Sequence, residues 1–429
     1  MKRILIWKLR LLSRWILRKY QPRVVGVTGS VGKSSTVEAV YTVLRKKFRV
    51  RKSYKNYNNE FGLPLSIIGG RAGGKNPFAW VGVVCRALRL ALFRDGQYPE
   101  LLVLEMGADQ PGDIQYLTSI APCHIGVFTA VGPAHLELFD SVEKIAREKA
   151  LVVTHITKNG YAVLNADDQL VMDAADKVRA QVITFGFMDT ATVRASELKV
   201  SAGPSADPWV DVQIKGLSFK LHYQGSTVPV FLPSVLGRHQ VYSGLAAAAV
   251  GISLGMNLSD VSTALREYQS PPGRMHLLPG IKHTSLIDDT YNSSPLAANA
   301  ALAVLKDIQV SGKKIAALGD MLELGSYTQE GHRDVGHHVV ESADVLVTVG
   351  ERAQYIAEGA REAGMNPDRV FHFDDTRQAG KFIQERMQTG DIVLIKGSQG
   401  ARMERVTREL MAEPLRATEL LVRQDSNWR

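Results

Sequence analysis

The chain has 429 residues, of which 45% are hydrophobic and 22% charged. This composition is typical of folded proteins, and the length allows two or three domains. The net charge of +9 would by itself suggest a nucleic-acid partner, but residues 1–23 hold eight basic residues and no acid, so the rest carries only +1. A nearly neutral body argues against nucleic acid as a partner. The two cysteines, Cys85 and Cys123, give neither a zinc-site spacing nor a disulfide framework, which fits a reducing cytoplasm.

The first 22 residues form a cationic segment with the period of an α-helix. Its apolar residues recur on one side of such a helix, at Leu5, Leu9, Leu12 and Ile16. Basic residues interrupt the apolar run, so it is too short to span a bilayer and lacks the core of a signal peptide. Two alternatives remain open: residues 1–20 make a peripheral contact with the inner face of a membrane, or they pack on the protein body with their charges in water.

From Arg23 to about Leu164, strands alternate with helices, which predicts a parallel sheet with helices on both faces. The expected strands are Val24–Thr28, Leu101–Glu105, Ile125–Thr129 and Ala162–Leu164, and the clearest helices are Ser34–Lys47 and Val142–His155. The apolar stretch Phe78–Phe93 carries two arginines. We interpret it as a packed helix rather than a membrane contact.

Between residues 182 and 233 the pattern changes to short β-rich runs, which predict a small antiparallel patch. These runs are Trp209–Ile214, Phe219–Tyr223 and Val228–Leu232, and an alanine-rich helix over Val241–Leu254 follows. The segment Ser270-Pro-Pro-Gly-Arg274 then breaks the chain. The expected organisation is a cationic helix (1–22), a central domain (23–270) and a C-terminal domain (271–429).

After this break the alternation resumes. The expected strands are Ser285–Asp288, Lys314–Leu318, Val345–Val349, Val370–Phe373 and Ile392–Lys396; the expected helices are Pro295–Ile308, Thr328–Ser342, Glu351–Ala363, Thr376–Thr389 and Ala401–Met411. The fold class is therefore α/β: a P-loop central domain with a parallel sheet and a small antiparallel patch, followed by a second doubly wound, Rossmann-like α/β domain.

The stretch from Val24 to Ser34 carries the strongest functional signal. It predicts a strand that runs into the glycine loop Gly29-Ser-Val-Gly-Lys-Ser34, followed by a helix. Such a loop cradles phosphates with backbone N–H groups, while Lys33 reaches the phosphates and the hydroxyl of Ser34 binds Mg²⁺. The spacing departs from the common P-loop pattern, because Val27 stands five residues before Gly32. The alternative is an ordinary strand–turn–helix.

Three further side chains follow predicted strand ends or lie on the next helix. Glu105 ends the second strand and could bind the Mg²⁺ held by Ser34, although strand-end acids are often simply solvated. His135 follows the third strand and is by itself more typical of a surface loop. Lys149 lies on the helix after it and by itself would be a solvated lysine.

In the last domain, polar residues end several strands, where ligands of open α/β sheets bind. These residues occur in Asp288-Asp-Thr-Tyr-Asn292, in Gly319-Asp320 and in Lys396-Gly-Ser398. The acids could bind a ribose or a metal. The alternative for the first group is the start of a helix, with Ser294 as N-cap before Pro295.

Several motifs in this order resemble those of the Mur ligases of peptidoglycan synthesis. They are Gly29-Ser-Val-Gly-Lys-Ser34, Tyr57-Asn-Asn-Glu-Phe-Gly62, Leu104-Glu-Met-Gly107, Ala134-His-Leu-Glu137, Asp288-Asp-Thr-Tyr-Asn292, Leu318-Gly-Asp-Met-Leu-Glu-Leu-Gly325 and Lys396-Gly-Ser398. The similarity spans about residues 23–411 and is greatest to the type that adds D-alanyl-D-alanine to a muramoyl tripeptide. It implies an ATP- and Mg²⁺-dependent, ADP-forming amide ligase that works through an acyl phosphate. The enzyme would be cytoplasmic, and a membrane contact of residues 1–20 would place it at the inner face of the membrane.

The resemblance also implies roles for individual residues. ATP would be bound by Gly29, Ser30, Val31, Gly32, Lys33, Ser34 and Ser35, and by Arg274 and Asp289 when the last domain closes. The metal would be held by Ser34, Glu105 and His135, and the substrates by Asn58, Asn59 and Asn292. Lys33, Glu105, His135 and Lys149 form the implied catalytic set, with Lys149 matching a lysine that is often carbamylated in this family.

The sequence departs from the family pattern in three ways. The phosphate loop begins near residue 26, so we expect the usual N-terminal UDP-binding domain to be missing. Gln240 stands where asparagine is usual near the adenine, and Ser294 where a second asparagine is common. The carboxylate substrate could therefore be a nucleotide-sugar peptide or a lipid-linked peptide, and the amine a dipeptide or another small amine. Two alternatives remain: a Mur-like ligase with other substrates, or a nucleotide-binding scaffold without turnover.

Overall fold

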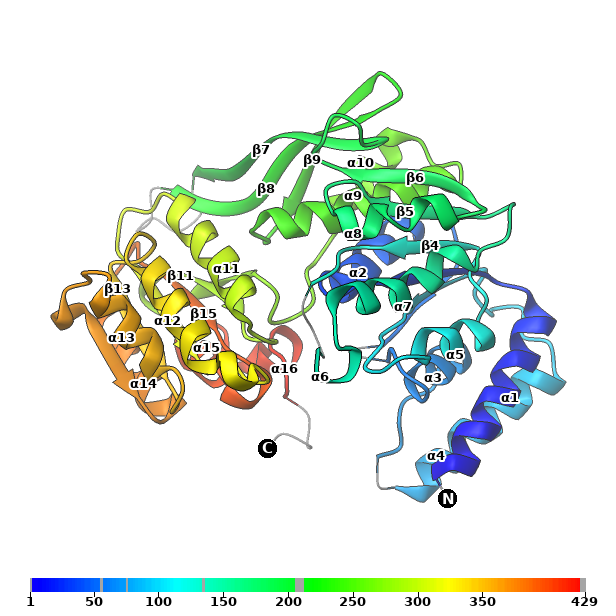
Figure 1. Ribbon diagram of the computed structural model, residues 1–429, viewed down its shortest axis with the longest axis horizontal. Coiled ribbons are helices and arrows are strands. Elements are labelled where there is room, and N and C mark those ends of the chain that lie inside the picture. The colour runs from blue at the N-terminus through cyan, green and yellow to red at the C-terminus, as the bar shows by residue number, and fades with distance from the viewer. Residues whose placement is uncertain (1, 55–56, 75, 133–135, 205–211, 425–429) are drawn as a thin grey trace. The chain divides into compact units, whose positions relative to one another are not determined.

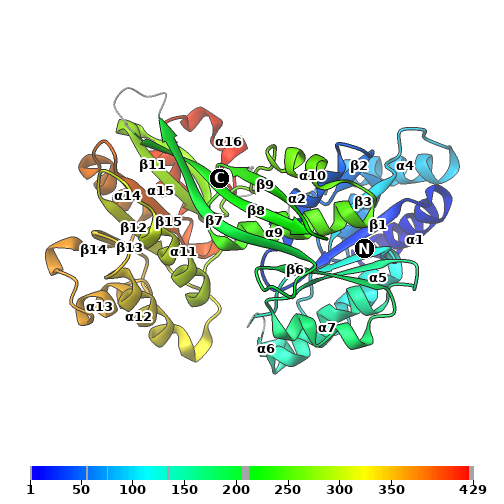
Figure 2. The same cartoon turned by 90° about the horizontal axis from the view of Figure 1, so that it is seen from above.

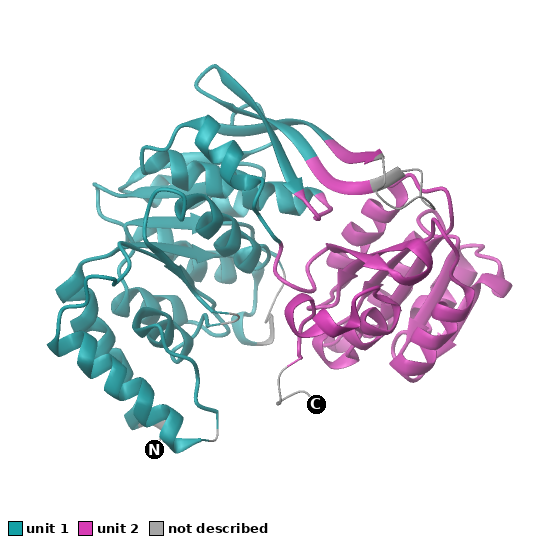
Figure 3. Cartoon of the chain, turned by 180° about the vertical axis from the view of Figure 1, so that it is seen from behind, with its two compact units in different colours: residues 1–198, 218–232, 238–269 teal, residues 199–217, 233–237, 270–429 magenta. Residues whose placement is uncertain are grey.

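The computed structural model describes residues 2–54, 57–74, 76–132, 136–204 and 212–424. The chain forms two compact units, which Figure 3 colours separately. Unit 1 comprises residues 1–198, 218–232 and 238–269, and unit 2 comprises residues 199–217, 233–237 and 270–429. The division runs through two long strands, β7 (Val193–Pro204) and β8 (Val212–Tyr223), as well as near residue 270.

Unit 1 is built around a parallel sheet (Figure 1). The order is β2-β3-β1-β4-β5-β6, with bounds β2 (Val50–Lys52), β3 (Leu101–Glu105), β1 (Arg23–Thr28), β4 (Ile125–Phe128), β5 (Tyr161–Asn165) and β6 (Gln181–Gly186). Strand β1 pairs in parallel with β3 on one side, where Val27 lies opposite Glu105, and with β4 on the other. Its carboxyl end therefore lies between those of β3 and β4, which places the loop after Thr28 beside Glu105.

The strands β7, β8 and β9 (Ser226–Pro233) continue the sheet beyond β6. Gln224 and Gly225 form the two-residue connection between β8 and β9, and both have positive φ (47° and 78°), as tight hairpin turns require. This is the predicted antiparallel part of the fold. The two runs expected at 209–214 and 219–223 are wrong as separate strands, because β8 is continuous from Val212; residues 205–211 lie outside the described part.

Helices cover both faces of the sheet, as Figure 2 shows for α2, α9 and α10 against α5 and α7. The bounds are α1 (Lys2–Tyr20), α2 (Lys33–Leu44), α3 (Gly62–Ile68), α4 (Pro77–Leu92), α5 (Asp113–Ile120), α6 (Leu136–Phe139), α7 (Val142–Thr154), α8 (Gln169–Met172), α9 (Arg238–Ser253) and α10 (Leu258–Leu265). Alternate residues of β1 point to opposite faces of the sheet. On one face, Val24 packs in the core that includes residues of α1, α3, α4, α5 and α7.

One face of α1 lies in this core, where Leu9, Leu12 and Ile16 are buried. At its end, the Nζ of Lys19 donates to the carbonyls of Leu90 (3.2 Å) and Ala91 (3.0 Å), the last turn of α4. A lysine suits this position because helix C-termini leave carbonyls unpaired and carry partial negative charge. Among the described helices, none is long and apolar enough to cross a bilayer.

Unit 2 is a second α/β sheet of order β10-β11-β15-β12-β13-β14. The strands are β10 (His276–Gly280), β11 (Thr284–Asp289), β15 (Ile392–Lys396), β12 (Lys314–Gly319), β13 (Val345–Val349) and β14 (Val370–Phe373); the helices are α11 (Pro295–Asp307), α12 (Thr328–Val339), α13 (Gln354–Glu362), α14 (Thr376–Arg386), α15 (Glu404–Leu410) and α16 (Ala417–Leu420). All pairs are parallel except the edge pair β10–β11. Residues of α14 and α15 share one buried core with the sheet.

The α/β fold class is confirmed, and most element boundaries agree within a few residues. The last long helix was expected from Ala401 but begins at Glu404, because Arg402 adopts a left-handed conformation (φ 56°). The first helix after the glycine loop ends at Leu44 rather than Lys47. The edge strands β2 and β10 were missed, since short edge strands carry little periodicity. Strands β6 and β7 were missed as well, and β6 extends the parallel sheet into the stretch expected to be antiparallel.

Candidate functional site

The glycine loop after β1 has the conformation that a phosphate site needs. Gly29 (φ 150°) and Gly32 (φ 82°) both adopt backbone angles that L side chains rarely reach. A Cβ on Gly29 would lie 2.0 Å from the Oγ1 of Thr129. Helix α2 starts directly after Gly32 without a side-chain cap. Its first N–H groups therefore face the loop without a capping side chain, as phosphate-binding helices do.

The end of β4 holds the loop in place. The Oγ1 of Thr129 donates to the carbonyl of Val31 (2.6 Å), and the N–H of Ser30 donates to the carbonyl of Ala130 (2.7 Å). The hydroxyl of Ser30 donates to the carbonyl of Gly132 (3.0 Å), and Val31 is exposed at the loop's tip. These three hydrogen bonds hold the loop against the segment after β4 within the protein itself.

Lys33, Ser34 and Glu105 meet at this loop. The Nζ of Lys33 donates to the carbonyls of Gly29 (2.8 Å) and Ser30 (3.3 Å). The hydroxyl of Ser34 donates to Oε2 of Glu105 (2.8 Å), and the buried carboxylate also accepts from Nδ2 of Asn58 at Oε1 (3.1 Å). Ser34 and Glu105, which the sequence predicts to share a Mg²⁺, are thus hydrogen-bonded to each other, with Asn58 as a second partner of the carboxylate.

A small cavity of about 110 Å³ opens beside these residues. Its lining residues come from the glycine loop, the segment after β3, the segment before α3 and the middle of α7: Ser30, Lys33, Asn58, Gly107, Ala108, Asp109 and Lys149. Lys149 is only 3% exposed. Burial, and next the positive charge of Lys33, lower the pKa of Lys149 from 10.5 to about 7. Two lysines thus share a cavity that an anion would suit.

The residues present fit a magnesium nucleotide. Mg²⁺ usually binds one or two carboxylate or hydroxyl ligands of the protein and completes its shell with phosphate oxygens and water. Ser34 and Glu105 supply such a pair beside the phosphate loop. The third predicted ligand, His135, lies outside the described residues, and within the described part no three His, Cys, Asp or Glu residues cluster as a metal site.

Three other predicted residues of unit 1 have mainly local contacts. The Oδ1 of Asn59 accepts from the N–H groups of Phe61 (3.2 Å) and Gly62 (3.0 Å), so this side chain shapes the turn before α3. Ser35 is buried in the first turn of α2. Gln240 is fully buried and accepts a hydrogen bond from the hydroxyl of Tyr268 at 2.7 Å.

In unit 2 the predicted residues gather at the carboxyl edge of the sheet. The Nζ of Lys396, at the end of β15, lies 2.6 Å from Oδ2 of Asp289 at the end of β11. The other oxygen of Asp289 accepts from the N–H of Met275 at 3.1 Å. The guanidinium of Arg274 lies over the ring of Tyr291, 4.0 Å from its centroid. Asn292 follows in the same loop and is exposed.

The loop after β11 is held through four successive carbonyls. Arg423 donates to the carbonyls of Thr290 (2.9 Å) and Tyr291, Lys396 to that of Asn292 (2.9 Å), and the hydroxyl of Ser398 to that of Ser293 (3.0 Å). Arg423 also pairs with the buried Glu404 at 3.2 Å. These contacts fix the backbone between Asp289 and α11, whose N-cap is Ser294 as predicted.

The preceding residue, Asp288, is a structural acid. It is fully buried and accepts hydrogen bonds from the hydroxyls of Thr290 (2.8 Å) and Thr407 (3.1 Å) and the N–H of Gly273 (2.9 Å). Desolvation raises its pKa from 3.8 to about 7, and the hydrogen bonds only partly oppose this shift. Asp288 therefore supports the Gly273 turn and the loop rather than lining a site.

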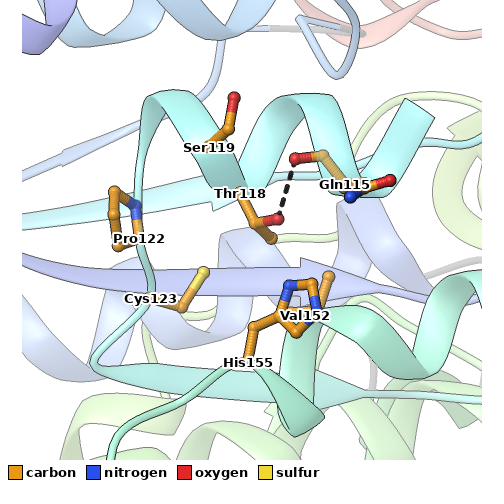
Figure 4. Close-up of a pocket in the computed structure, with 7 residues that line it drawn as sticks. All are labelled: Gln115, Thr118, Ser119, Pro122, Cys123, Val152 and His155. Carbon is orange, nitrogen blue, oxygen red and sulfur yellow. Dashed lines mark hydrogen bonds between the residues drawn. The ribbon is translucent and has the colours of Figure 1, made fainter. Parts of the chain in front are cut away.

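Figure 4 shows a second cavity of unit 1, of about 200 Å³, that contains none of the predicted site residues. It lies between the ends of α5 and α7 and is lined by Gln115, Thr118, Ser119, Pro122, Cys123, Val152 and His155. Burial raises the pKa of the Cys123 thiol to about 12, so it stays protonated and is a poor nucleophile. Cys123 therefore gives this cavity no reactive thiolate.

Sequence reasoning missed the residues that support the site. Thr129 holds the glycine loop, and Ser53 accepts the N–H of Glu105 through its hydroxyl (3.0 Å). Arg423 lies far along the chain from the loop it clamps. Thr129 and Ser53 lie at strand ends, which is a weak signal, whereas nothing in the sequence points to Arg423.

Comparisons with known proteins agree with this geometry. Residues 87–251 match the family model of the Mur ligase middle domain, and residues 273–399 match that of the Mur ligase, glutamate ligase domain. The UDP-N-acetylmuramoyl-tripeptide–D-alanyl-D-alanine ligase of Bacillus subtilis is 29% identical over 95% of this chain and 80% of its own length. The ligase of the same name from Mycobacterium leprae is 31% identical over 87% and 71%.

Among solved structures, the MurF ligase from Thermotoga maritima in complex with ADP superposes with a TM-score of 0.75 at 28% identity, covering 94% of this chain and 83% of that one. The shared fold, the matched domains and the 31% identity to a curated relative agree with one another. This chain belongs to the Mur ligase family.

Proposed function

We propose that this chain joins D-alanyl-D-alanine to a muramoyl tripeptide at the expense of ATP. A carboxylate oxygen of the tripeptide attacks the γ-phosphorus, which forms an acyl phosphate and releases ADP. The amine of the dipeptide then attacks the acyl carbon, loses a proton and expels inorganic phosphate. The observation that carries the proposal is the cavity of unit 1, where the glycine loop, Lys33, the Ser34–Glu105 pair and Lys149 meet. The names of the relatives from Bacillus subtilis and Mycobacterium leprae support the choice of substrates.

In this proposal the chain mainly positions reactants and neutralises charge. The N–H groups of residues 29–35 and the ammonium group of Lys33 bind the phosphates. Ser34, Glu105 and His135 hold the metal, which when bound offsets phosphate charge. Asn58, fixed against Glu105, faces the peptide substrate. Asn59 and Asn292 would extend the substrate site, and Arg274 and Asp289 would contact the nucleotide.

We further propose that Lys149 is carbamylated. The neutral amine attacks CO₂ with its lone pair and loses a proton, which gives a carbamate anion. The lowered pKa supports this step, because about half of the amine is neutral near pH 7. A carbamate would also pair with Lys33 across the cavity. With ¹³C-bicarbonate, we expect a carbamate NMR signal that strengthens as the pH rises through about 7 and is absent in Lys149→Gln. A spectrum identical for the two proteins would contradict carbamylation.

The test of the main proposal is phosphate release with ATP, Mg²⁺, UDP-N-acetylmuramoyl-tripeptide and D-alanyl-D-alanine, each omitted in turn. We expect release that requires all four components and a product whose mass equals the two substrates joined with loss of water. Lys33→Ala is the inactive control. Release without the dipeptide would contradict amide synthesis by this mechanism.

Two alternatives predict other outcomes of the same assay. If ATP binds but these substrates give no phosphate, release with another carboxylate and amine would identify a Mur-like ligase of different specificity. Nucleotide binding without release for every amine would identify a scaffold. The arrangement of Lys33, Ser34 and Glu105 argues against the scaffold, because a protein without turnover has no need of a metal-binding pair beside the phosphates.

The tripeptide could be supplied as a nucleotide-sugar or as a lipid-linked peptide. We propose a cytoplasmic enzyme, and a lipid-linked substrate would bring it to the inner face of the membrane. Replacing the UDP-linked tripeptide by its lipid-linked form in the assay distinguishes the two, since the preferred substrate has the higher kcat/KM.

A further inference from the structure

Helices α1 and α4 each expose an apolar stripe on the side opposite their buried face. On α1 the exposed residues are Ile4 (60%), Trp7 (61%), Leu11 (52%) and Trp15 (50%); on α4 and its end they are Phe78 (83%), Val81 (58%), Leu88 (40%), Leu92 (61%) and Phe93 (68%). With 3.6 residues per turn, the α1 stripe spans about a quarter of the helix circumference, on the side away from Leu9, Leu12 and Ile16. Large apolar side chains gathered in this way mark an interaction surface.

The two helices belong to one packed substructure. Lys19 of α1 caps the last carbonyls of α4, and the hydroxyl of Tyr20 donates to the carbonyl of Phe93 (2.9 Å). Both helices contribute to the same buried core of unit 1, and they lie side by side in Figure 1. The two helices that carry the exposed stripes are therefore neighbours that share one core.

The charge of these segments is strongly one-sided. Residues 1–23 hold eight basic residues and no acid, and residues 61–94 hold five basic residues and no acid. The rest of the chain has a net negative charge. On α1, the exposed Lys8, Arg14 and Arg18 lie on the same side of the helix as Trp7 and Trp15.

We propose that the exposed faces of α1 and α4 form a docking surface for an anionic phospholipid bilayer. Tryptophan and aliphatic side chains would enter the boundary between head groups and acyl chains, while the lysines and arginines pair with lipid phosphates. A protein partner would need a surface that is both apolar and acidic, whereas an anionic bilayer always presents phosphates above its acyl chains. The proposal does not depend on the ligase reaction, since lipid binding is measured without turnover.

Because one face of α1 is part of the core of unit 1, only substitutions on its exposed face can test this surface. Deletion of residues 1–20 would remove Leu9, Leu12 and Ile16 from the core and unfold part of unit 1. Substitutions confined to the exposed side avoid this problem. We choose Trp7→Ser with Trp15→Ser for α1, Val81→Ser with Leu92→Ser for α4, and Arg14→Gln with Arg18→Gln for charge. Leu296→Ser with Leu415→Ser, which are 69% and 96% exposed in unit 2, is the matched control.

The full chain is mixed with vesicles of phosphatidylglycerol and phosphatidylcholine, or of phosphatidylcholine alone, and separated by flotation. We expect the partition coefficient to be at least about tenfold higher for the anionic vesicles and to fall with added salt. The α1 and charge variants should each lose about tenfold and the α4 variant less, while the unit 2 control binds like the parent protein.

Absence of binding to anionic vesicles, or equal binding by all variants, would overturn the proposal. Sedimentation without lipid provides the other decisive readout. A concentration-dependent dimer that the α4 substitutions abolish, together with no vesicle binding, would assign the surface to a second copy of the chain instead.

Discussion

The two polar clusters of the molecule treat their lysines in opposite ways. In unit 1, Lys33 and Lys149 line one cavity together with Asp109, and burial, followed by the positive charge of Lys33, lowers the pKa of Lys149. In unit 2, Lys396 forms an ion pair with Asp289 and donates a hydrogen bond to the carbonyl of Asn292. The cavity of unit 1 therefore holds a lysine whose neutral form is favoured, whereas the cation of Lys396 is balanced by the carboxylate of Asp289. The Lys396 ion pair shapes its loop, and in our proposal the phosphates bind in unit 1.

The sharpest test of this contrast is Lys33→Ala. Loss of the ammonium group at the phosphates should lower the rate of phosphate release by at least about 100-fold. The fold should be retained, since Lys33 lies at the start of α2 outside the buried core. Steady-state phosphate release and thermal unfolding measure the two effects. Turnover close to that of the parent protein would show that the cavity is not the phosphate site.

Lys396→Met tests the balanced cluster through stability. The Lys396 side chain is 3% exposed and that of Asp289 15%, so removal of the cation leaves a largely buried carboxylate unpaired. We expect a loss of about 3–5 kcal/mol in the free energy of unfolding, measured by chemical denaturation. In the double variant with Asp289→Asn, much of this loss should be recovered.

The control for Lys396→Met is Lys306→Met, which removes an exposed ion pair with Glu341. Its effect should stay below about 1 kcal/mol. Equal effects of the two substitutions would mean that the Lys396 pair is solvated and has no special structural role.

Arg423→Met extends the test to the clamp on the loop after β11. It removes the donors to the carbonyls of Thr290 and Tyr291 but leaves Glu404 its second partner, Arg402, at 2.6 Å. The expected loss is therefore smaller, about 1–3 kcal/mol. Hydrogen exchange at residues 290–292 should become faster. Arg416→Met, which breaks only exposed pairs, is the control, and unchanged exchange in Arg423→Met would refute the clamp.

The last prediction concerns the pH dependence of stability. The folded-state pKa of Asp288 is raised to about 7, above the unfolded value near 3.8. Its contribution is therefore fully present below about pH 4 and is lost as the pH rises through about 7. Asp288→Asn should flatten the stability curve in this window, as measured by denaturation at several pH values. A slope equal to that of the parent protein would show that Asp288 is ionised in the folded state.

Much of the fold was predictable because its signals are local. The glycines at 29 and 32, the apolar strand before them and the helix after them predicted the phosphate loop. The strand-end position of Glu105 predicted its place beside Ser34, because parallel neighbours present their carboxyl ends at one edge. The Ser294–Pro295 pair likewise predicted the start of α11.

Other features depend on packing between distant segments. From the sequence, Lys149 is expected to be a solvated helix lysine. In the folded chain, burial and next the nearby charge of Lys33 lower its pKa. The two alternatives for residues 1–20 could not be separated by sequence, because the same helix buries one face in the core and exposes tryptophans on the other. The anchors Thr129 and Arg423 gain their roles from carbonyls that lie close only in the folded chain.

By itself, the sequence determined the α/β class, the glycine loop between β1 and α2 and the family, since backbone conformation and motif spacing depend on neighbours along the chain. The tertiary structure alone decided which charges are buried, which are balanced and which face a cavity. Burial and Coulomb interactions depend on distance in space, and that distance is set by how the sheets bring strand ends together.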